Sequence, residues 1–372
     1  PGEVYPEEPE LPFSVELIDA RTVRLRVDSR VKFGQDEPSL MLVKEPAPNP
    51  DAWSIEEGEG EVVYRSEHGA VRVGLDPFRI TLEDPKGRVL TRTLHFKDAR
   101  RALLNSDAPP FAFVRQSGDM SRRIAASFAL AHDEKLYGCG ESFTRLNKRG
   151  QRVIVMTNDA HGAQAGEMYK PIPFFLSSRG YGMFVHTSAP LTFDFGHGSD
   201  EANVIYSGDQ FLDLFVFVGE PKDVLEAYTA LTGRSPVPPL WSFGFWMSRI
   251  TYQSEDEVRR VARALREHRV PCDVIHIDTG WFERDWCCDY RFSTSRFDDP
   301  AKMIQDLREQ GFRISLWQLP YFTPANALYR EAIQKGYVVR GPGGEPATED
   351  AVIDFSNPEA VRWYQGLLAG LL

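Results

Sequence analysis

Apolar residues in the first 235 positions recur mostly with a period of two. Strict alternation of apolar and polar side chains, as in Phe-Ser-Val-Glu-Leu-Ile at 13–18, predicts a strand with one buried face. Asp-Pro at 76–77 and Lys-Gly at 86–87 are typical of the turns between such strands. The pattern predicts strands at 13–18, 22–27, 71–75, 78–82, 153–156, 173–176, 182–186, 191–195 and 212–218, with one helix at 222–231. We therefore expect an antiparallel β-sandwich domain over residues 1–235.

The pattern changes after a proline-rich segment, Ser-Pro-Val-Pro-Pro, at 235–239. Apolar runs at 241–247, 272–278 and 312–319 then alternate with helical stretches at 255–268, 300–310 and 325–335, and a further helix is expected after Asn357. Ser254 and Glu257 form a capping-box pattern at the start of the first of these helices. Continuous apolar strands that alternate with helices predict a parallel sheet covered on both faces.

Residues 236–372 are therefore predicted to form the first three βα units of a (β/α)8 TIM barrel, the second domain of a multi-domain chain. A complete barrel needs ~250 residues, so the barrel within this sequence is incomplete. The sequence ends on an apolar helix face at 366–372, which has no cap. We expect this end to be a cut rather than a natural terminus.

Charge and cysteine content restrict the class of partner. The net charge is −11 and the Lys and Arg residues do not cluster, which disfavours nucleic acid and an anionic membrane surface as partners. No apolar run approaches the ~20 residues of a membrane-spanning helix, and no signal peptide is visible. The four cysteines lack Cys-x-x-Cys spacing, so we expect free buried thiols. These features favour a cytoplasmic protein without a cofactor, although a chain that begins at Pro1 leaves a removed leader open.

Polar and aromatic residues follow each strand predicted for the barrel. Asp278 begins the stretch Asp-Thr-Gly-Trp-Phe after the second strand, Trp317 ends the third, and Tyr252 follows the first. The chemistry of parallel barrels lies at these strand ends. Indole rings pack on the apolar C–H faces of sugars, and a carboxylate accepts hydrogen bonds from sugar hydroxyls. The sequence therefore predicts a sugar site at this edge, with Gly280 allowing the chain to turn under the ligand.

Each of these residues also has a structural interpretation. An Asp in the position of Asp278 is also typical of a helix cap or a buried ion pair, and Trp246 and Trp317 fit packing in the barrel core. His276, inside an apolar strand, is more typical of a hydrogen-bonded core histidine. A metal held by Asp278 and His276 is disfavoured, because the two are only two residues apart in a strand and no third ligand is evident.

Several longer segments carry a resemblance. The segments WSFGFWMSRITYQSEDEV at 241–258, DVIHIDTGWF at 273–282 and FRISLWQLPY at 312–321 resemble the barrel of glycoside hydrolase family 31, the retaining α-glucosidases and α-xylosidases. LYGCGESFTRLNKRGQ at 136–151 and MYKPIPFFLSSRGYGMFVHTS at 168–188 resemble the galactose-mutarotase-like sandwich of the same family. The resemblance begins near residue 60 and extends through nearly all of the remaining sequence.

The resemblance implies roles for particular residues. Asp278 matches the acid that binds hydroxyls in the −1 subsite, and Trp317 matches the Trp that walls this subsite. Asp159 matches an acid that a sandwich loop sends to the −1 sugar. Trp281 and Tyr252 lie where the family shapes the −1 and +1 walls. The substrate-binding residues expected are thus Asp278, Trp317, Asp159, Trp281, Tyr252 and Thr279.

The catalytic acids of the family are expected outside this sequence. Retaining glycosidases use two carboxyl groups ~5–5.5 Å apart. The family's nucleophile motifs, Lys-Thr-Asp-Phe-Gly-Glu or Trp-x-Asp-Met-Asn-Glu, do not occur here, and Asp354 precedes the fourth helix and does not replace them. We therefore expect no catalytic residue within this chain, and an inactive chain if it is isolated.

The expected activity is that of an exo-acting α-glycoside hydrolase that removes a terminal xylosyl or glucosyl residue from an oligosaccharide or α-glycoside. α-Xylosidase is favoured, because Thr-Gly-Trp-Phe at 279–282 differs from the Ile-Asp-Tyr-type stretch of many α-glucosidases. The alternatives are an α-glucosidase and a non-catalytic carbohydrate-binding relative. Homo-oligomerisation of the full-length protein is left open.

Overall fold

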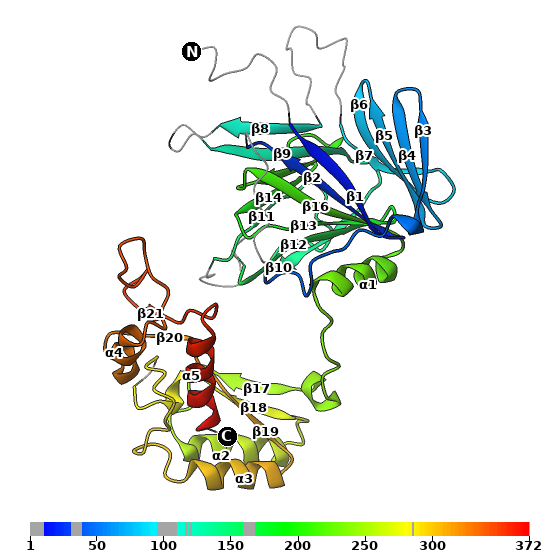
Figure 1. Ribbon diagram of the computed structural model, residues 1–372. Helices are drawn as coiled ribbons and strands as arrows, with labels where there is room; N and C mark the ends of the chain where they lie inside the picture. Colours follow the sequence, from blue (N-terminus) through cyan, green and yellow to red (C-terminus); the bar gives the residue numbers. More distant parts are fainter. Residues whose placement is uncertain are drawn as a thin grey trace. The chain divides into compact units, whose positions relative to one another are not determined.

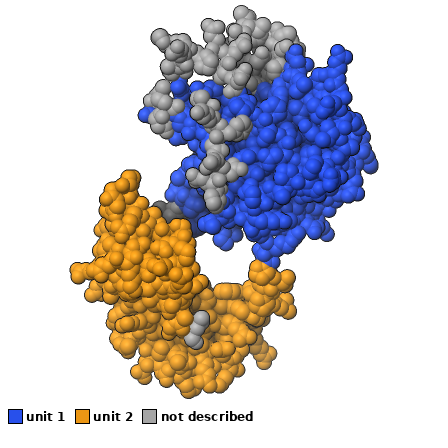
Figure 2. All heavy atoms as spheres, viewed as in Figure 1, with its two compact units in different colours: residues 1–235 blue, residues 236–372 orange. Residues whose placement is uncertain are grey.

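The computed structural model describes residues 11–30, 39–94, 110–115, 118, 121–158, 168–284 and 286–371. The chain divides into two compact units, Pro1–Ser235 and Pro236–Leu372 (Figure 2). The division falls within the proline-rich segment, where rigid proline backbones separate one folding unit from the next.

The first unit is built from antiparallel sheets, as the alternating pattern predicts (Figure 1). The six-stranded sheet has the order β1 (Phe13–Asp19), β2 (Thr22–Asp28), β16 (Phe211–Val218), β13 (Tyr181–Val185), β12 (Lys170–Ser177) and β10 (Leu136–Glu141). The five-stranded sheet has the order β11 (Arg152–Val155), β14 (Leu191–Phe195), β15 (Ala202–Ser207), β9 (Arg122–Ala129) and β8 (Phe111–Arg115). A separate meander contains β3 (Ser54–Gly58), β4 (Glu61–Ser66), β5 (Gly69–Leu75), β6 (Phe78–Glu83) and β7 (Val89–Arg92).

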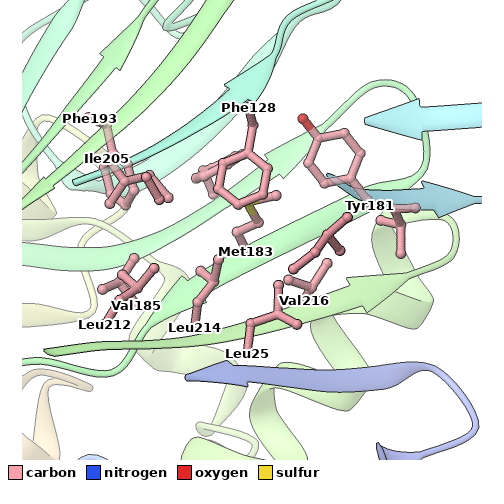
Figure 3. Close-up of a cluster of buried hydrophobic side chains, with 14 of the residues drawn as sticks. Leu25, Phe128, Tyr181, Met183, Val185, Phe193, Ile205, Leu212, Leu214 and Val216 are labelled. Atoms are coloured by element: carbon pink, nitrogen blue, oxygen red, sulfur yellow. The ribbon is translucent and has the colours of Figure 1, made fainter. Parts of the chain in front are cut away.

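The two larger sheets bury a common core (Figure 3). Phe193 and Ile205 enter it from the five-stranded sheet, and Met183, Leu214 and Leu25 enter it from the six-stranded sheet. These side chains are buried, and burial of one such side chain contributes about 1.5–3 kcal/mol. The structure thereby confirms the sandwich that the sequence predicts.

The outer face of the six-stranded sheet is also buried. Helix α1 (Pro221–Thr232) places Val224 and Leu231 in a second apolar cluster, which contains Phe184 and Phe215 from the sheet. Because both faces of β13 are covered, all five of its residues are buried. This explains why strand 181–185 reads as a continuous apolar run instead of an alternating one.

A buried ion pair crosses the same sheet. The Arg24 guanidinium donates from Nε and Nη2 to the two carboxylate oxygens of Asp213, each at 2.7 Å. His186 Nδ1 lies 2.8 Å from Asp213 Oδ2. Burial alone would raise the pKa of Asp213, but the hydrogen bonds from Arg24 and His186 outweigh burial and lower it. The carboxylate therefore stays ionised inside the domain.

The second unit contains three parallel strands, in the order β17 (Trp246–Arg249), β18 (Val274–Ile277) and β19 (Arg313–Leu316). The helices are α2 (Glu255–Glu267), α3 (Pro300–Glu309), α4 (Ala327–Gln334) and α5 (Pro358–Ala369), and β20 (Tyr321–Phe322) pairs antiparallel with β21 (Ala351–Val352). Each helix begins at a side chain that accepts a backbone N–H of its first turn, from Ser254, Asp299, Asn326 and Asn357 respectively. This is the start of a βα barrel, as predicted. No helix among the described residues is long and apolar enough to cross a membrane.

Two local predictions for this unit were wrong. Residues 241–247 were expected to be one strand, but Leu240–Phe243 is a 3-10 helix. The neighbouring strand β18 begins at Val274, which pairs with Trp246, so the residues before Trp246 have no strand partner among the described residues. The capping box before α2 is also incomplete, because the Glu257 carboxylate accepts from the N–H of Gln253 at 2.8 Å instead of that of Ser254.

The helices do not cover the whole sheet. Ile275 and Ile277 of β18 share one apolar cluster with Val258 of α2 and Met303 of α3. The opposite face carries Ser248, His276 and Ser315, which are exposed or only partly buried. The expectation of a sheet covered on both faces is therefore wrong for the face that carries these three residues. In a barrel this open, more polar face is the one that turns inward.

Candidate substrate-binding site

The ends of β18 and β19 bring two predicted site residues side by side. Asp278 directly follows Ile277, and Trp317 directly follows Leu316, the residue paired with Ile277 in the parallel register. The Trp317 N–H donates to the Ile277 carbonyl at 2.9 Å and continues this pairing beyond the strands. Because side chains alternate along a strand, Asp278 lies on the same face as His276, away from α2 and α3.

The two carboxylate oxygens of Asp278 have different surroundings. Oδ1 accepts the N–H of Thr279 at 2.8 Å and caps the 3-10 helix Thr279–Trp281. Oδ2 has no hydrogen bond from a described residue, and Nε2 of His276 lies 3.9 Å away. The Asp278 side chain is 18% exposed. The cap interpretation therefore accounts for one oxygen and leaves the other as an acceptor that a ligand can reach.

His276 is held by the next strand. Its Nδ1 lies 3.0 Å from Oγ of Ser315, which stands opposite it in the register. This is the hydrogen-bonded histidine that the sequence favours. Among the described residues, no group of three or more His, Cys, Asp or Glu side chains is arranged to hold a metal ion.

Trp317 lies at the edge of the site and is only partly buried. Its ring makes T-shaped contacts with Trp286, at 5.1 Å between centroids, and with Phe282, at 6.3 Å. Its carbonyl oxygen accepts from Nε1 of Trp281 at 2.8 Å. Trp317 is thus fixed from below while part of its indole stays accessible. Trp286, which the sequence analysis did not single out, is 57% exposed.

Three further residues predicted to bind substrate lie in the core of the unit. The Trp281 ring is fully buried and packs on Phe282 at 4.0 Å. Tyr252 is fully buried under Arg249, whose guanidinium carbon lies 5.2 Å from the ring centroid. The Thr279 hydroxyl is buried and pairs with that of a neighbouring threonine at 2.7 Å. Their burial leaves these three side chains little surface for a ligand in this structure, and their role in substrate binding stays a prediction.

The structure explains the glycine at position 280 by packing and not by the turn that the sequence analysis expected. Its φ does not lie in the left-handed region, but a Cβ at this position would lie 2.2 Å from Cγ2 of Thr251 and 2.7 Å from the Tyr252 carbonyl oxygen. The glycine therefore permits close packing of the first strand end on the second. Glycine is required at this position because Thr251 and Tyr252 pack against it, and not because the backbone turns beneath the ligand.

Two further acidic residues are named from the sequence. Asp159 falls outside the described residues. Asp354 accepts the N–H of Ser356 at 2.9 Å in the turn before α5, a local backbone role.

Two family models match the chain. The model of the glycosyl hydrolases family 31 TIM-barrel domain matches residues 235–371, and the model of the glycosyl hydrolase 31 N-terminal galactose mutarotase-like domain matches residues 12–194. The chain belongs to glycoside hydrolase family 31. The two matched segments follow each other in the order that the structure shows, sandwich first and barrel second.

Family 31 relatives with different substrates are similar to this chain. It is 34% identical over 276 residues to "Alpha-xylosidase XylQ" of Lactiplantibacillus pentosus, covering 72% of this chain and 36% of the relative. It is 30% identical over 344 residues to "Alpha-glucosidase 2" of Bacillus thermoamyloliquefaciens, covering 88% of this chain and 40% of the relative. A Flavobacterium johnsoniae GH31 dextranase, solved with glucose, matches with a TM-score of 0.79 and 25% identity, over 96% of this chain and 43% of the dextranase.

The family 31 chain therefore spans 36% to 43% of the length of these three relatives. It covers only part of the catalytic barrel that they share. Its cysteines are free, as predicted, although Cys287 is only partly buried. Burial raises the pKa of the Cys288 thiol to about 11, so this thiol stays protonated and unreactive near neutral pH.

Proposed function

We propose that this chain is the N-terminal part of a retaining, exo-acting α-glycoside hydrolase that removes a terminal α-linked xylosyl or glucosyl residue, with xylosyl favoured. The observation that supports this best is the pairing of Asp278 with Trp317 at adjacent strand ends. One carboxylate oxygen is free of described partners, and a partly exposed indole stands beside it. These are the two kinds of group that hold a sugar ring.

In this proposal the residues of the chain bind and orient the sugar. Oδ2 of Asp278 accepts a hydrogen bond from a hydroxyl of the terminal ring, and the Trp317 indole packs on the apolar face of that ring. The bond-breaking step needs two further carboxyl groups, a nucleophile and an acid/base. We assign both to the part of the barrel that the family 31 relatives have beyond the segment matched here.

The preference for xylose is supported by similarity and not by a contact. The relative at 34% identity is named an α-xylosidase, whereas the one at 30% is named an α-glucosidase. The Thr279 side chain is buried and the Cβ direction of Gly280 is filled by Thr251, so this stretch does not itself select between the sugars. The hydroxymethyl group of glucose must therefore be accepted or refused by other residues.

The test is to assay the full-length protein on p-nitrophenyl α-xyloside and p-nitrophenyl α-glucoside side by side. We expect a higher kcat/KM on the xyloside. A higher kcat/KM on the glucoside would make the protein an α-glucosidase. Sugar binding without turnover of either substrate would favour the non-catalytic carbohydrate-binding alternative.

A further inference from the structure

The segment after the second barrel strand has an unusual backbone. Trp286, Cys288 and Tyr290 all have left-handed φ values, of 66°, 42° and 56°. Residues with a Cβ seldom adopt this conformation, and bulky side chains avoid it most. Alternate left-handed residues over five positions persist only where the surrounding structure enforces them, and such places are often functional.

Three hydrogen bonds enforce this conformation from neighbouring elements. The Asn326 side chain is buried, and its amide donates to the carbonyl oxygens of Cys287 and Cys288, the latter at 3.2 Å. The Leu319 N–H donates to Sγ of Cys288 at 3.3 Å. The segment is thus tied to the end of the third strand region and to the start of α4.

A fourth contact ties the end of the segment to the same strand region. The Tyr290 hydroxyl donates to the Leu319 carbonyl oxygen at 3.1 Å, and the Tyr290 ring is buried. The strained backbone therefore has a buried anchor at Tyr290 and an exposed indole at Trp286.

The exposed indole contacts a residue of the proposed sugar site. The Trp286 ring stands against Trp317, with 5.1 Å between centroids and 81° between planes. Two rings at a right angle cannot both lie flat on the same face of one sugar. A ring packed on Trp317 therefore leaves the Trp286 face for a neighbouring group of the substrate.

We propose that Trp286 packs on the second ring of the substrate, the one glycosidically linked to the terminal sugar held by Asp278 and Trp317. This assignment rests on the proposed function, because it uses the same site. It makes Trp286 a residue for recognising oligosaccharides over simple glycosides, with Asn326 as the residue that positions it.

The test is saturation-transfer NMR with the 372-residue chain, using methyl α-xyloside and xylosyl-α-1,6-glucose, with methyl α-glucoside and isomaltose as the glucosyl pair. The method reports contact separately for each sugar ring. In Trp286→Ala we expect the signal of the second ring, relative to the first, to fall, because the indole protons that would transfer saturation to that ring are removed. Trp286→Phe should retain most of that signal.

The matched control is Trp241→Ala, which removes a half-exposed tryptophan that precedes β17, away from the strand ends that carry the site. It should leave both rings unchanged, and circular dichroism should show that the variants fold alike. Unchanged second-ring signal in Trp286→Ala, or an equal fall for both rings, would overturn the assignment while the sugar site itself stood. No transfer to any ring in the parent chain would remove the proposed site and this inference with it.

Discussion

Replacement of Asp278 by Asn in the full-length protein tests the site most directly. Asn keeps the size of Asp and retains one carbonyl oxygen. This oxygen can still accept the Thr279 N–H, as Oδ1 of Asp278 does at 2.8 Å, and so can still cap the 3-10 helix. The lost group is then Oδ2, which becomes an NH2 donor facing a sugar hydroxyl. The local backbone should survive while the contact with the ligand changes.

The expected loss of kcat/KM follows from the number of Asp278 carboxylate oxygens that are free to bind the sugar. Only Oδ2 lacks a hydrogen bond from a described residue, so one charge-assisted hydrogen bond to the sugar is at stake. Such a bond contributes about 1.5–3 kcal/mol. We therefore expect kcat/KM to fall roughly 10- to 150-fold, at about 1.4 kcal/mol for each factor of ten.

The assay is kcat/KM on the better nitrophenyl glycoside, with covalent labelling by a fluoro-glycoside as a second measurement. Asp354→Asn is the matched control, because Asp354 also accepts a backbone N–H in a local turn and should leave kcat/KM unchanged. Labelling should persist in Asp278→Asn at a lower rate, since the nucleophile lies elsewhere. A kcat/KM within twofold of the parent would make Asp278 a purely structural acid. Complete loss of labelling in a folded, sugar-binding variant would make it the nucleophile.

Three further predictions concern stability and association. Gly280→Ala should lower the free energy of unfolding by about 1–3 kcal/mol in urea titrations, because its Cβ would lie 2.2 Å from another side chain. Gly366→Ala, which has open space in helix α5, should instead raise it by about 0.5–1 kcal/mol, and a similar loss in both would contradict the packing argument. Hydrogen bonds hold the folded pKa of Asp213 below its ordinary value, so its stabilisation should be complete above the unfolded pKa near ~3.9 and vanish as the pH falls through the folded pKa. The urea midpoint of Asp213→Asn should therefore fall less than that of the parent between pH 5 and pH 3. An equal fall of the urea midpoint in both proteins would refute this. The isolated chain should show no hydrolysis and should self-associate through the open β17 edge, where Ile250 is 84% exposed. Size-exclusion chromatography should show less association for Ile250→Lys than for the parent chain. A monomeric parent chain with a sharp cooperative melt would contradict the predicted self-association.

Much of the fold follows from local chemistry that a sequence displays. Helix starts at Ser254 and Asn357 and the helix end at Gly233 are visible because capping depends on residues one turn apart or less. The two-domain order follows from the change of period at the prolines. The 3-10 helix Leu240–Phe243 was missed because a strand also needs a neighbouring strand to pair with. The residues of β17 do not reveal where β18 begins, and pairing with β18 starts only at Trp246.

The strand ends that carry the candidate site could be predicted from the sequence, but the direction of every side chain there could not. Alternation places Asp278 and Trp317 on one face, because both directly follow paired strand residues. Beyond Asp278 the chain enters a 3-10 turn, where alternation no longer applies, and Trp281 turns inward. Trp286 was overlooked because nothing in its residue type signals a left-handed backbone, which its neighbours impose from Leu319 and Asn326.

The topology of the six-stranded sheet sets the order in which the first unit can fold during synthesis. Strand β2 pairs with β16, and Arg24 meets Asp213 at a separation of 189 residues. A ribosome adds about 5–20 residues per second, so the β1–β2 hairpin waits ~10–40 s for its partner strand. The meander β3–β7, whose strands pair only with their neighbours in sequence, can form within that interval. Until β16 is synthesised, this hairpin leaves the apolar side chains of Leu25 and Val27 without the core that buries them in the folded chain.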